Sequence, residues 1–397
     1  MKIGLLVSNP KTAFNYGAAI FERTFTNGLK KKKQKVITLC PDPVTSEKLK
    51  QLPELAAALI AESLIEHKQK AKKCDVLYAT NWNAVGYVGQ GIPLVTTFHC
   101  TFNGILKIIG KEPESPDMEE KDIWEKYVDQ IKTLSMSPAY LIQKGKENTA
   151  LVENFVAQHS TRVVAVSERV KAEMVSYFHL PADKIVVIEN GIPRQWFIGK
   201  NKKCPQCEPK IKKWRELKKP ILIWLARIGT NESTFKTKGL DRALEVMSQI
   251  KDAHKVIISF TSRPERYREL FAPYGVEFIS NWPYEHLPHL MRAGDIFIQT
   301  SRYEGFGLTL LEAMISSLAC VSFPVGVATE VIKDGSSGFL SSTTSEMIEK
   351  INYLIKHPAK RRQMGKRAAL LGKKNYRLTT MVDKYIKLFK EIKKQKK

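Results

Sequence analysis

The sequence predicts an α/β protein in which a strand–helix alternation runs twice along the chain. Most strand candidates are continuous apolar runs, and helical stretches lie between most of them. Continuous apolarity indicates strands that are covered on both faces, as in a parallel sheet. The alternation breaks between Pro193 and Pro220 and then resumes, which favours two successive domains. The length of 397 residues agrees with this division.

The first half of the chain begins with a strand candidate over residues 2–8 and a helix candidate from about Gly17 to Lys31. Further apolar runs predict strands at 35–40, 75–80, 93–99, 162–168 and 184–191. We assign these elements to an amino-terminal domain over residues 1–195.

A basic segment separates the two halves. Between Pro193 and Pro220 the chain carries about ten basic residues, two tryptophans and the pair Cys204 and Cys207. We interpret residues 196–219 as a basic linker or surface excursion. A zinc site at the two cysteines would need further ligands that the sequence does not offer nearby, so we expect no metal there.

The second half repeats the pattern, and we assign residues 220–375 to a carboxy-terminal domain. Helices are expected from Gly239 and from about Thr309, and the tail from Thr379 to Lys397 predicts an amphipathic helix. The strand candidates are 220–228, 254–260, 276–280, 295–301 and 319–325.

The chain is strongly basic. Lys and Arg number 64 and Asp and Glu number 40, so the formal charge is +24. Such a charge favours a polyanion, an anionic membrane surface or a phosphate-bearing substrate as partner. No apolar run approaches the ~20 residues of a membrane span, and the first residues resemble a strand more than a secretory signal. The scattered cysteines form no disulfide pattern, so we expect a cytoplasmic protein.

One candidate site follows the strand at 295–301. Glu304, the loop Gly305–Leu308 and Glu312 stand at the carboxyl end of that strand, where open α/β sheets bind ligands. Gly305 and Gly307 permit close approach of the backbone, and the free N–H groups of a helix start attract anions and hydroxyl oxygens. The two carboxylates suit sugar hydroxyls. The alternative is a capping box, in which Glu312 only caps its own helix.

Two cations and one histidine complete the candidate set. Arg227 ends the strand at 220–228, and Lys238 with Gly239 precedes a helix, an arrangement that suits a diphosphate. The alternative is that both cations are solvated surface. His99 ends the strand at 93–99, where it either contacts a substrate or plays a structural part.

Missing motifs narrow the choice. The sequence contains no Asp-x-Asp, no P-loop and no Gly-x-Gly-x-x-Gly after the first strand. These absences disfavour a metal-clamped nucleotide, an NTPase and a nicotinamide enzyme.

Taken together, these residues resemble a retaining glycosyltransferase of the type B architecture, in glycosyltransferase family four (glycosyl transferases group 1). The resemblance rests on residues 163–174, 184–192 and 335–340 together with the candidate sites above. It implies two Rossmann-like domains that face each other across a cleft. It also implies that the last helix, over residues 376–397, crosses back to the amino-terminal domain.

The resemblance also implies a role for each candidate residue. Glu312 would bind the ribose of a nucleotide-diphosphate sugar, and Glu304 with the loop Gly305, Phe306, Gly307 and Leu308 would hold the sugar. Arg227 and Lys238 would bind the diphosphate without a metal or other cofactor. His99 would lie near the donor sugar. The catalytic set is therefore His99, Arg227, Lys238 and Glu304.

One further donor subsite is implied near the first helix. Gly17 stands in the loop where the family often has a Gly-Gly pair that contacts the donor phosphate or the acceptor.

The expected function is transfer of a sugar from a UDP- or GDP-sugar to a glycan or lipid-linked acceptor, in cell-surface glycan or glycolipid synthesis. The alternatives are a nucleotide-sugar epimerase on the same fold and a non-enzymatic protein that binds nucleic acid or another polyanion. No nucleic-acid partner is expected, because aromatic residues are not interleaved with the basic runs.

A peripheral association with the inner face of the membrane is a further hypothesis. Some of the basic runs would dock on an anionic leaflet together with an apolar stretch at 105–109, which contains Ile105, Leu106, Ile108 and Ile109 beside Lys107 and Lys111. The alternative is that the basic runs form a Lys-rich solvated surface.

Overall fold

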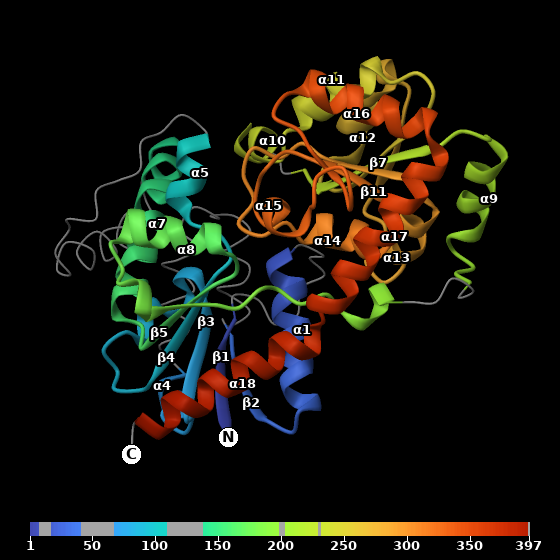
Figure 1. The fold of residues 1–397 in the computed structure, drawn as a ribbon. Helices are drawn as coiled ribbons and strands as arrows, with labels where there is room; N and C mark the ends of the chain where they lie inside the picture. The colour runs from blue at the N-terminus through green and yellow to red at the C-terminus, as the bar shows by residue number, and fades with distance from the viewer. Residues whose placement is uncertain (8–16, 41–66, 109–137, 198–202, 229–231, 396–397) are drawn as a thin grey trace. The chain divides into compact units, whose positions relative to one another are not determined.

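The computed structural model describes residues 1–7, 17–40, 67–108, 138–197, 203–228 and 232–395 of the protein (Figure 1). These residues divide into two compact units. The first combines the amino-terminal strand and Ala18–Glu189 with Met381–Lys397, and the second contains Asn190–Thr380. Each unit contains one six-stranded sheet in which neighbouring strands are parallel.

The sheet of the first unit has the order β2-β1-β3-β4-β5-β6. Its strands are β1 (Lys2–Leu6), β2 (Lys35–Leu39), β3 (Val76–Thr80), β4 (Leu94–Phe98), β5 (Arg162–Ala165) and β6 (Ile185–Val187). Each lies inside an apolar run that the sequence marked as a strand. The residues of β3 and β4 are buried throughout, because helices and loops cover both faces of the sheet.

The first unit also contains α1 (Gly17–Lys31), α4 (Lys68–Ala71), the 3₁₀ segment η2 (Asn81–Tyr87), α5 (Phe102–Ile108), α7 (Pro138–His159), α8 (Glu168–Phe178), the 3₁₀ segment η3 (Ala182–Lys184) and most of α18 (Leu378–Gln395). Helix α8 begins where the Ser167 side chain accepts a hydrogen bond from the Val170 amide. It ends at His179, which adopts a left-handed conformation.

Helix α18 completes the core of the first unit. The hydroxyl groups of Tyr385 and Thr97 lie 2.9 Å apart, and the Tyr385 ring lies 4.8 Å from that of Phe25 and 5.6 Å from that of Tyr78. Lys32 at the end of α1 forms an ion pair with Asp383. Figure 1 shows α18, in red, crossing α1. The apolar side of the tail therefore packs against residues from the beginning of the chain.

The second unit has the sheet order β12-β11-β10-β7-β8-β9. Its strands are β7 (Ile221–Arg227), β8 (His254–Phe260), β9 (Val276–Ser280), β10 (Ile296–Gln299), β11 (Ala319–Ser322) and β12 (Phe339–Leu340). The helical elements are η4 (Arg194–Phe197), α9 (Glu208–Glu216), α10 (Glu232–Lys238), α11 (Leu240–Gln249), α12 (Pro264–Phe271), η5 (Ala272–Tyr274), α13 (Leu287–Ala293), α14 (Leu308–Ile315), α15 (Ala328–Val331), α16 (Thr344–Lys356) and α17 (Pro358–Asn375).

The order of the second sheet defines where its ligand site is expected. The chain moves outward from β7 through β8 to β9, and then restarts at β10 on the other side of β7. The topological switch point therefore lies between β7 and β10. Ligands of open α/β sheets bind at the carboxyl ends of the strands at such a point.

The segment expected as a linker, residues 196–219, differs from that expectation over its described part. Helix α9 buries Ile211 and Trp214, and the Glu277 carboxylate on β9 accepts hydrogen bonds from Lys210 and Trp214 at 2.5 and 2.8 Å. The contacts of the chain group this segment with the second unit, which begins at Asn190 and not at residue 220. Lys212, Lys213 and Arg215 occupy the exposed side of α9, and their charges mask its packed side in the sequence.

The two segments that connect the units are hydrogen-bonded to each other. The Ile192 amide donates to the Tyr376 carbonyl at 2.8 Å, and the Leu378 amide donates to the Ile192 carbonyl at 3.2 Å. A Cβ atom at Gly191 would lie 2.5 Å from the Leu378 Cα atom, so only glycine permits this approach.

Candidate active site

The turn that carries Lys238 is fixed by a glycine. Gly239 separates α10 from α11 in a left-handed conformation with φ of 62°, and a Cβ atom there would lie 2.0 Å from the Thr300 carbonyl oxygen. The Thr300 hydroxyl donates to the Gly239 carbonyl at 2.8 Å and accepts from the Trp224 indole at 2.9 Å. The turn before α11 is therefore held against the end of β10.

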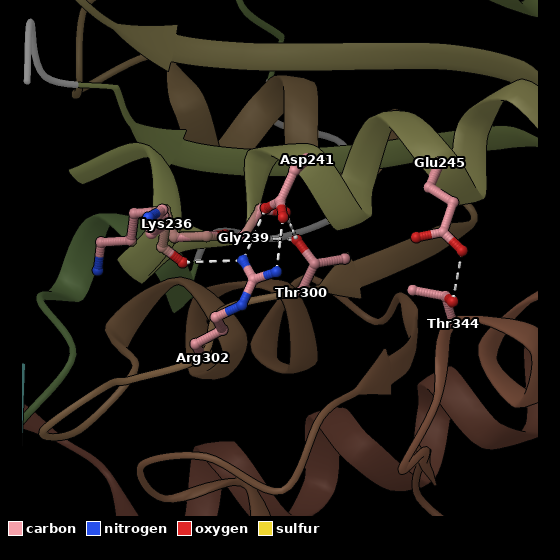
Figure 2. Close-up of polar contacts among 8 residues, drawn as sticks. Lys236, Gly239, Asp241, Glu245, Thr300, Arg302 and Thr344 are labelled. Atoms are coloured by element: carbon pink, nitrogen blue, oxygen red, sulfur yellow. Dashed lines mark hydrogen bonds and ion pairs between the residues drawn. The ribbon is translucent and has the colours of Figure 1, made fainter. Parts of the chain in front are cut away.

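Arg302 also holds this turn. Its guanidinium donates to both oxygens of Asp241, at 2.7 and 2.5 Å, and to the Lys236 carbonyl at 3.1 Å (Figure 2). A bidentate pair of this kind fixes orientation as well as distance. Burial alone would raise the pKa of Asp241. The hydrogen bonds and charge of Arg302 have a larger effect in the opposite direction, so the pKa lies below its ordinary value.

Lys238 and Glu304 lie in direct contact. The Lys238 ammonium is 2.8 Å from Oε1 and 3.0 Å from Oε2 of Glu304, and the Ser301 hydroxyl donates to Oε1 at 2.8 Å. Both side chains are mostly shielded from solvent. Two residues that the sequence analysis placed in one site are thus brought together.

The loop Gly305–Leu308 forms the start of α14. Gly307 is the N-cap residue, with φ of 99°, and no side chain caps the helix. The Phe306 carbonyl accepts from the Val327 amide at 2.7 Å, while a Cβ atom at Gly326 would lie 2.3 Å from the same oxygen. Glu312 does not cap α14, because it lies in the second turn of the helix and its carboxyl group accepts a hydrogen bond from Tyr284. The capping-box alternative for Glu312 is wrong.

Glu312 is a buried carboxyl group with a tyrosine partner. Its side chain lies in the second turn of α14, the residue is 4% exposed, and the Tyr284 hydroxyl donates to Oε1 at 2.7 Å. The Trp196 indole donates to the Tyr284 oxygen at 3.0 Å. Burial raises the pKa of Glu312 to about 8, and the Tyr284 hydrogen bond acts against this rise. The sequence analysis did not identify Tyr284 or Trp196, because no local motif marks them.

Arg227 is the last residue of β7 and is exposed to solvent. Because β7 pairs directly with β10, Arg227 and the loop after β10 lie on the same edge of the sheet at the switch point. The second unit thus presents Arg227, the Lys238–Glu304 pair and the start of α14 along one edge.

The other two candidates are His99, which belongs to the first unit, and Gly17. His99 follows β4, and its ring packs edge-on against Phe21 at 4.4 Å. Its Nε2 atom is buried without a hydrogen-bond partner among the described residues, and burial lowers the pKa of His99 to about 4. The imidazole is therefore neutral near pH 7. Gly17 is the first residue of α1, and the loop at 8–16 lies outside the described residues.

The turn that follows β4 depends on Glu153, which the sequence analysis missed. This buried residue on α7 accepts hydrogen bonds from the Asn81 side chain and the Phe102 amide, both at 2.7 Å. Asn81 in turn accepts from the His99 amide at 3.4 Å. Burial raises the pKa of Glu153 to about 8, against the effect of these two hydrogen bonds. Glu153 and Asn81 therefore hold the backbone of His99.

The apolar stretch proposed to dock on a membrane is only partly available. Leu106 is 1% exposed and belongs to the core, so its expected role is wrong. Ile105 and Ile108 are partly exposed, while Ile109 and Lys111 lie outside the described residues. Within the described ranges no helix combines the length and apolarity that a bilayer crossing needs.

The described residues also contain no group of three or more His, Cys, Asp or Glu side chains arranged to hold a metal ion. Cys204 lies 3.6 Å from the His286 ring, and Cys207 donates to the His286 carbonyl.

Two Rossmann-like units, each with a six-stranded parallel sheet, give the chain the architecture of the type B glycosyltransferases. Two family models match the chain, Glycosyltransferase Family 4 over residues 17–196 and Glycosyl transferases group 1 over residues 209–370. The chain therefore belongs to the group 1 glycosyltransferases of family four, as its motifs predicted.

Similarity to individual proteins is more distant. A trehalose synthase of Pyrococcus horikoshii is 33% identical over 190 residues, and the match spans 44% of each chain. Sucrose-phosphate synthase of Thermosynechococcus elongatus has a TM-score of 0.74 at 16% identity, over 98% of both chains. Anabaena HepE, solved with UDP-glucose, has a TM-score of 0.68 at 18% identity, over 98% of this chain and all of HepE. The two structural similarities establish the fold.

Proposed function

We propose that the protein transfers a sugar from a nucleotide-diphosphate sugar to a hydroxyl group of an acceptor. The observation that carries this proposal is the contact between Lys238 and Glu304 beside the start of α14, with Glu312 one turn further on. A cation for phosphate and two carboxyl groups for hydroxyl groups are what a nucleotide sugar requires. The structure of HepE with UDP-glucose supports a UDP-sugar as the first donor to test.

Lys238 and Arg227 would stabilise the departing diphosphate. As the bond between the sugar C1 and the phosphate oxygen breaks, negative charge grows on the phosphate and positive charge on the sugar. Fixed cations aimed at that oxygen lower the barrier, which is the part that a metal plays in other transferases. We therefore propose a reaction that proceeds without a divalent metal.

We also propose that the anomeric configuration is retained. The acceptor oxygen would attack C1 from the face that the phosphate leaves, and the phosphate would take the acceptor proton. The neutral His99 would donate or accept a hydrogen bond near the sugar and would not serve as a cation.

The acceptor is proposed to be a glycan or a lipid-linked sugar, handled by the first unit. The matched relatives include a trehalose synthase and a sucrose-phosphate synthase, whose names describe products with two joined sugars. Free glucose and glucose 6-phosphate therefore belong among the acceptors that are tested.

The experiment combines the protein with UDP-, GDP- and ADP-sugars, with each acceptor class, with and without EDTA. A transferase produces a glycoside and a free nucleoside diphosphate in equal amounts, unaffected by EDTA, and NMR of the anomeric proton reports the configuration. Conversion of the donor sugar without an acceptor would indicate an epimerase instead. Turnover that disappears with EDTA would contradict the proposed metal independence.

A further inference from the structure

Three buried side chains of the second unit form a continuous hydrogen-bonded chain. The Trp196 indole nitrogen lies 3.0 Å from the Tyr284 oxygen, which lies 2.7 Å from Oε1 of Glu312. All three residues are buried. Trp196 belongs to η4, shortly after the chain enters the second unit, and Tyr284 precedes α13. The chain therefore joins the entry segment to α14.

The chemistry of tryptophan fixes the direction of this chain. An indole N–H can only donate, so the Tyr284 oxygen must accept from Trp196. The Tyr284 hydroxyl in turn donates its hydrogen to Oε1 of Glu312. The other carboxyl oxygen, Oε2, receives no hydrogen bond from the described residues. Because Tyr284 occupies Oε1, Oε2 is the oxygen of Glu312 that can accept a hydrogen bond from a ligand.

We propose that Tyr284, fixed by Trp196, is a positioning residue that holds Oε1 of Glu312 so that Oε2 accepts hydrogen bonds from the ribose of the donor. This inference rests on the proposed function. It assigns a part to two residues that lie outside every motif in the sequence.

The hydrogen bond also acts on the charge of Glu312. Burial is the main cause that raises the pKa of Glu312, and Tyr284 lowers it. Removal of the hydroxyl should therefore raise this pKa above about 8 and leave less carboxylate at neutral pH. The elements packed against α14 carry other titratable groups, namely Arg194, His289, Arg292, Cys320 and the basic residues of α17.

The experiment measures the affinity for UDP and GDP by calorimetry between pH 6 and 9. The variants are Tyr284→Phe, Glu312→Gln and the double variant. Tyr353→Phe is the matched control, because Tyr353 is an exposed residue of α16. Wild-type affinity should rise with pH as Glu312 ionises. Tyr284→Phe should lower affinity about tenfold at pH 7 and move the midpoint upward, because hydrogen bonds to charged groups are the strong ones.

The double variant separates positioning from a general loss of structure. Glu312→Gln should abolish the pH dependence, and adding Tyr284→Phe to it should change affinity little, because both act through one group. A Tyr284→Phe variant that weakens binding equally at every pH would overturn the inference.

A second measurement needs no ligand, so it separates this inference from the proposed function. Carbon-13 NMR of labelled glutamate gives the titration midpoint of Glu312 in the free protein, assigned with Glu312→Gln. Tyr284→Phe should raise that midpoint, and an unchanged midpoint would overturn the positioning role. Absence of nucleotide binding by the wild type, with the midpoint still raised, would reject the proposed function alone.

Discussion

The ammonium group of Lys238 lies within hydrogen-bond distance of both carboxylate oxygens of Glu304, at 2.8 and 3.0 Å. Without a ligand, each charge is therefore neutralised by the other. A phosphate group that binds Lys238 would replace Glu304 as its partner and leave the carboxylate able to accept hydrogen bonds from sugar hydroxyls. One contact thus connects the proposed phosphate and sugar subsites.

Lys238→Met should reduce turnover on the order of 10²-fold or more, because the variant loses a cation that stabilises the departing phosphate. Steady-state kinetics with saturating donor measure this loss. Lys356→Met, on the exposed end of α16, removes the same charge from the same unit and should keep normal turnover. Wild-type turnover in Lys238→Met would contradict the assigned role.

Gly239→Ala should destabilise the protein strongly. Its φ of 62° strains any residue with a side chain, and its Cβ atom would collide with the Thr300 carbonyl. Gly275→Ala is the matched control, since φ is 59° there and only the end of Lys255 lies nearby, at 3.8 Å. Urea unfolding should show about 1 kcal/mol lost at position 275 and several kcal/mol at position 239. Equal losses would show that the close approach to Thr300 is unimportant.

The free energy of unfolding should fall as the pH rises through the neutral range. Glu153 and Glu312 ionise near pH 4.5 when unfolded but only near pH 8 when folded, so stability is lost between these values. His99 acts in the opposite sense below about pH 6.5, since burial lowers its pKa to about 4. Urea titrations between pH 6.5 and 8 therefore isolate the two glutamates.

Glu153→Gln and Glu312→Gln should each flatten this decline by a few kcal/mol at most, because one pKa unit corresponds to about 1.4 kcal/mol. Glu349→Gln, at an exposed position of α16, serves as the control and should leave the slope unchanged. A slope that neither buried variant alters would contradict the raised pKa values.

Glu277→Ala should loosen α9. The Glu277 carboxylate accepts hydrogen bonds from Lys210, Trp214 and His254. Burial raises its pKa, but these three partners lower it to about 2 overall. The variant leaves the partners unpaired and should cost about 2 to 3 kcal/mol. Amide hydrogen exchange in α9 should accelerate, whereas Glu216→Ala at the exposed end of α9 should leave it unchanged.

The strands and the ends of strands could be predicted from the sequence. Continuous apolar runs located all strands of both sheets except β12, which has two residues and no periodic pattern. Local patterns marked Arg227, Lys238 and Glu304 as separate candidates near strand ends, and the resemblance to the glycosyltransferase family placed them in one donor site. The structure brings Lys238 and Glu304 into direct contact.

The partners of those residues could not be predicted in the same way. Tyr284 meets Glu312 from 28 positions away, and Asn81 meets Glu153 from 72 positions away. Such pairs depend on how helices and loops pack, and no local pattern records this. The sequence could have indicated Arg302, because it stands two positions before Glu304 in the same loop.

The position of α18 has a consequence for how the protein is made. Tyr385 packs against Phe25 and Tyr78, so the interior of the first unit includes side chains from near both ends of the chain. During synthesis, this interior stays incomplete until the ribosome has released residues 381–392. The amino-terminal unit, although translated first, is therefore expected to finish folding after the second one, and nascent chains that lack α18 should bind chaperones.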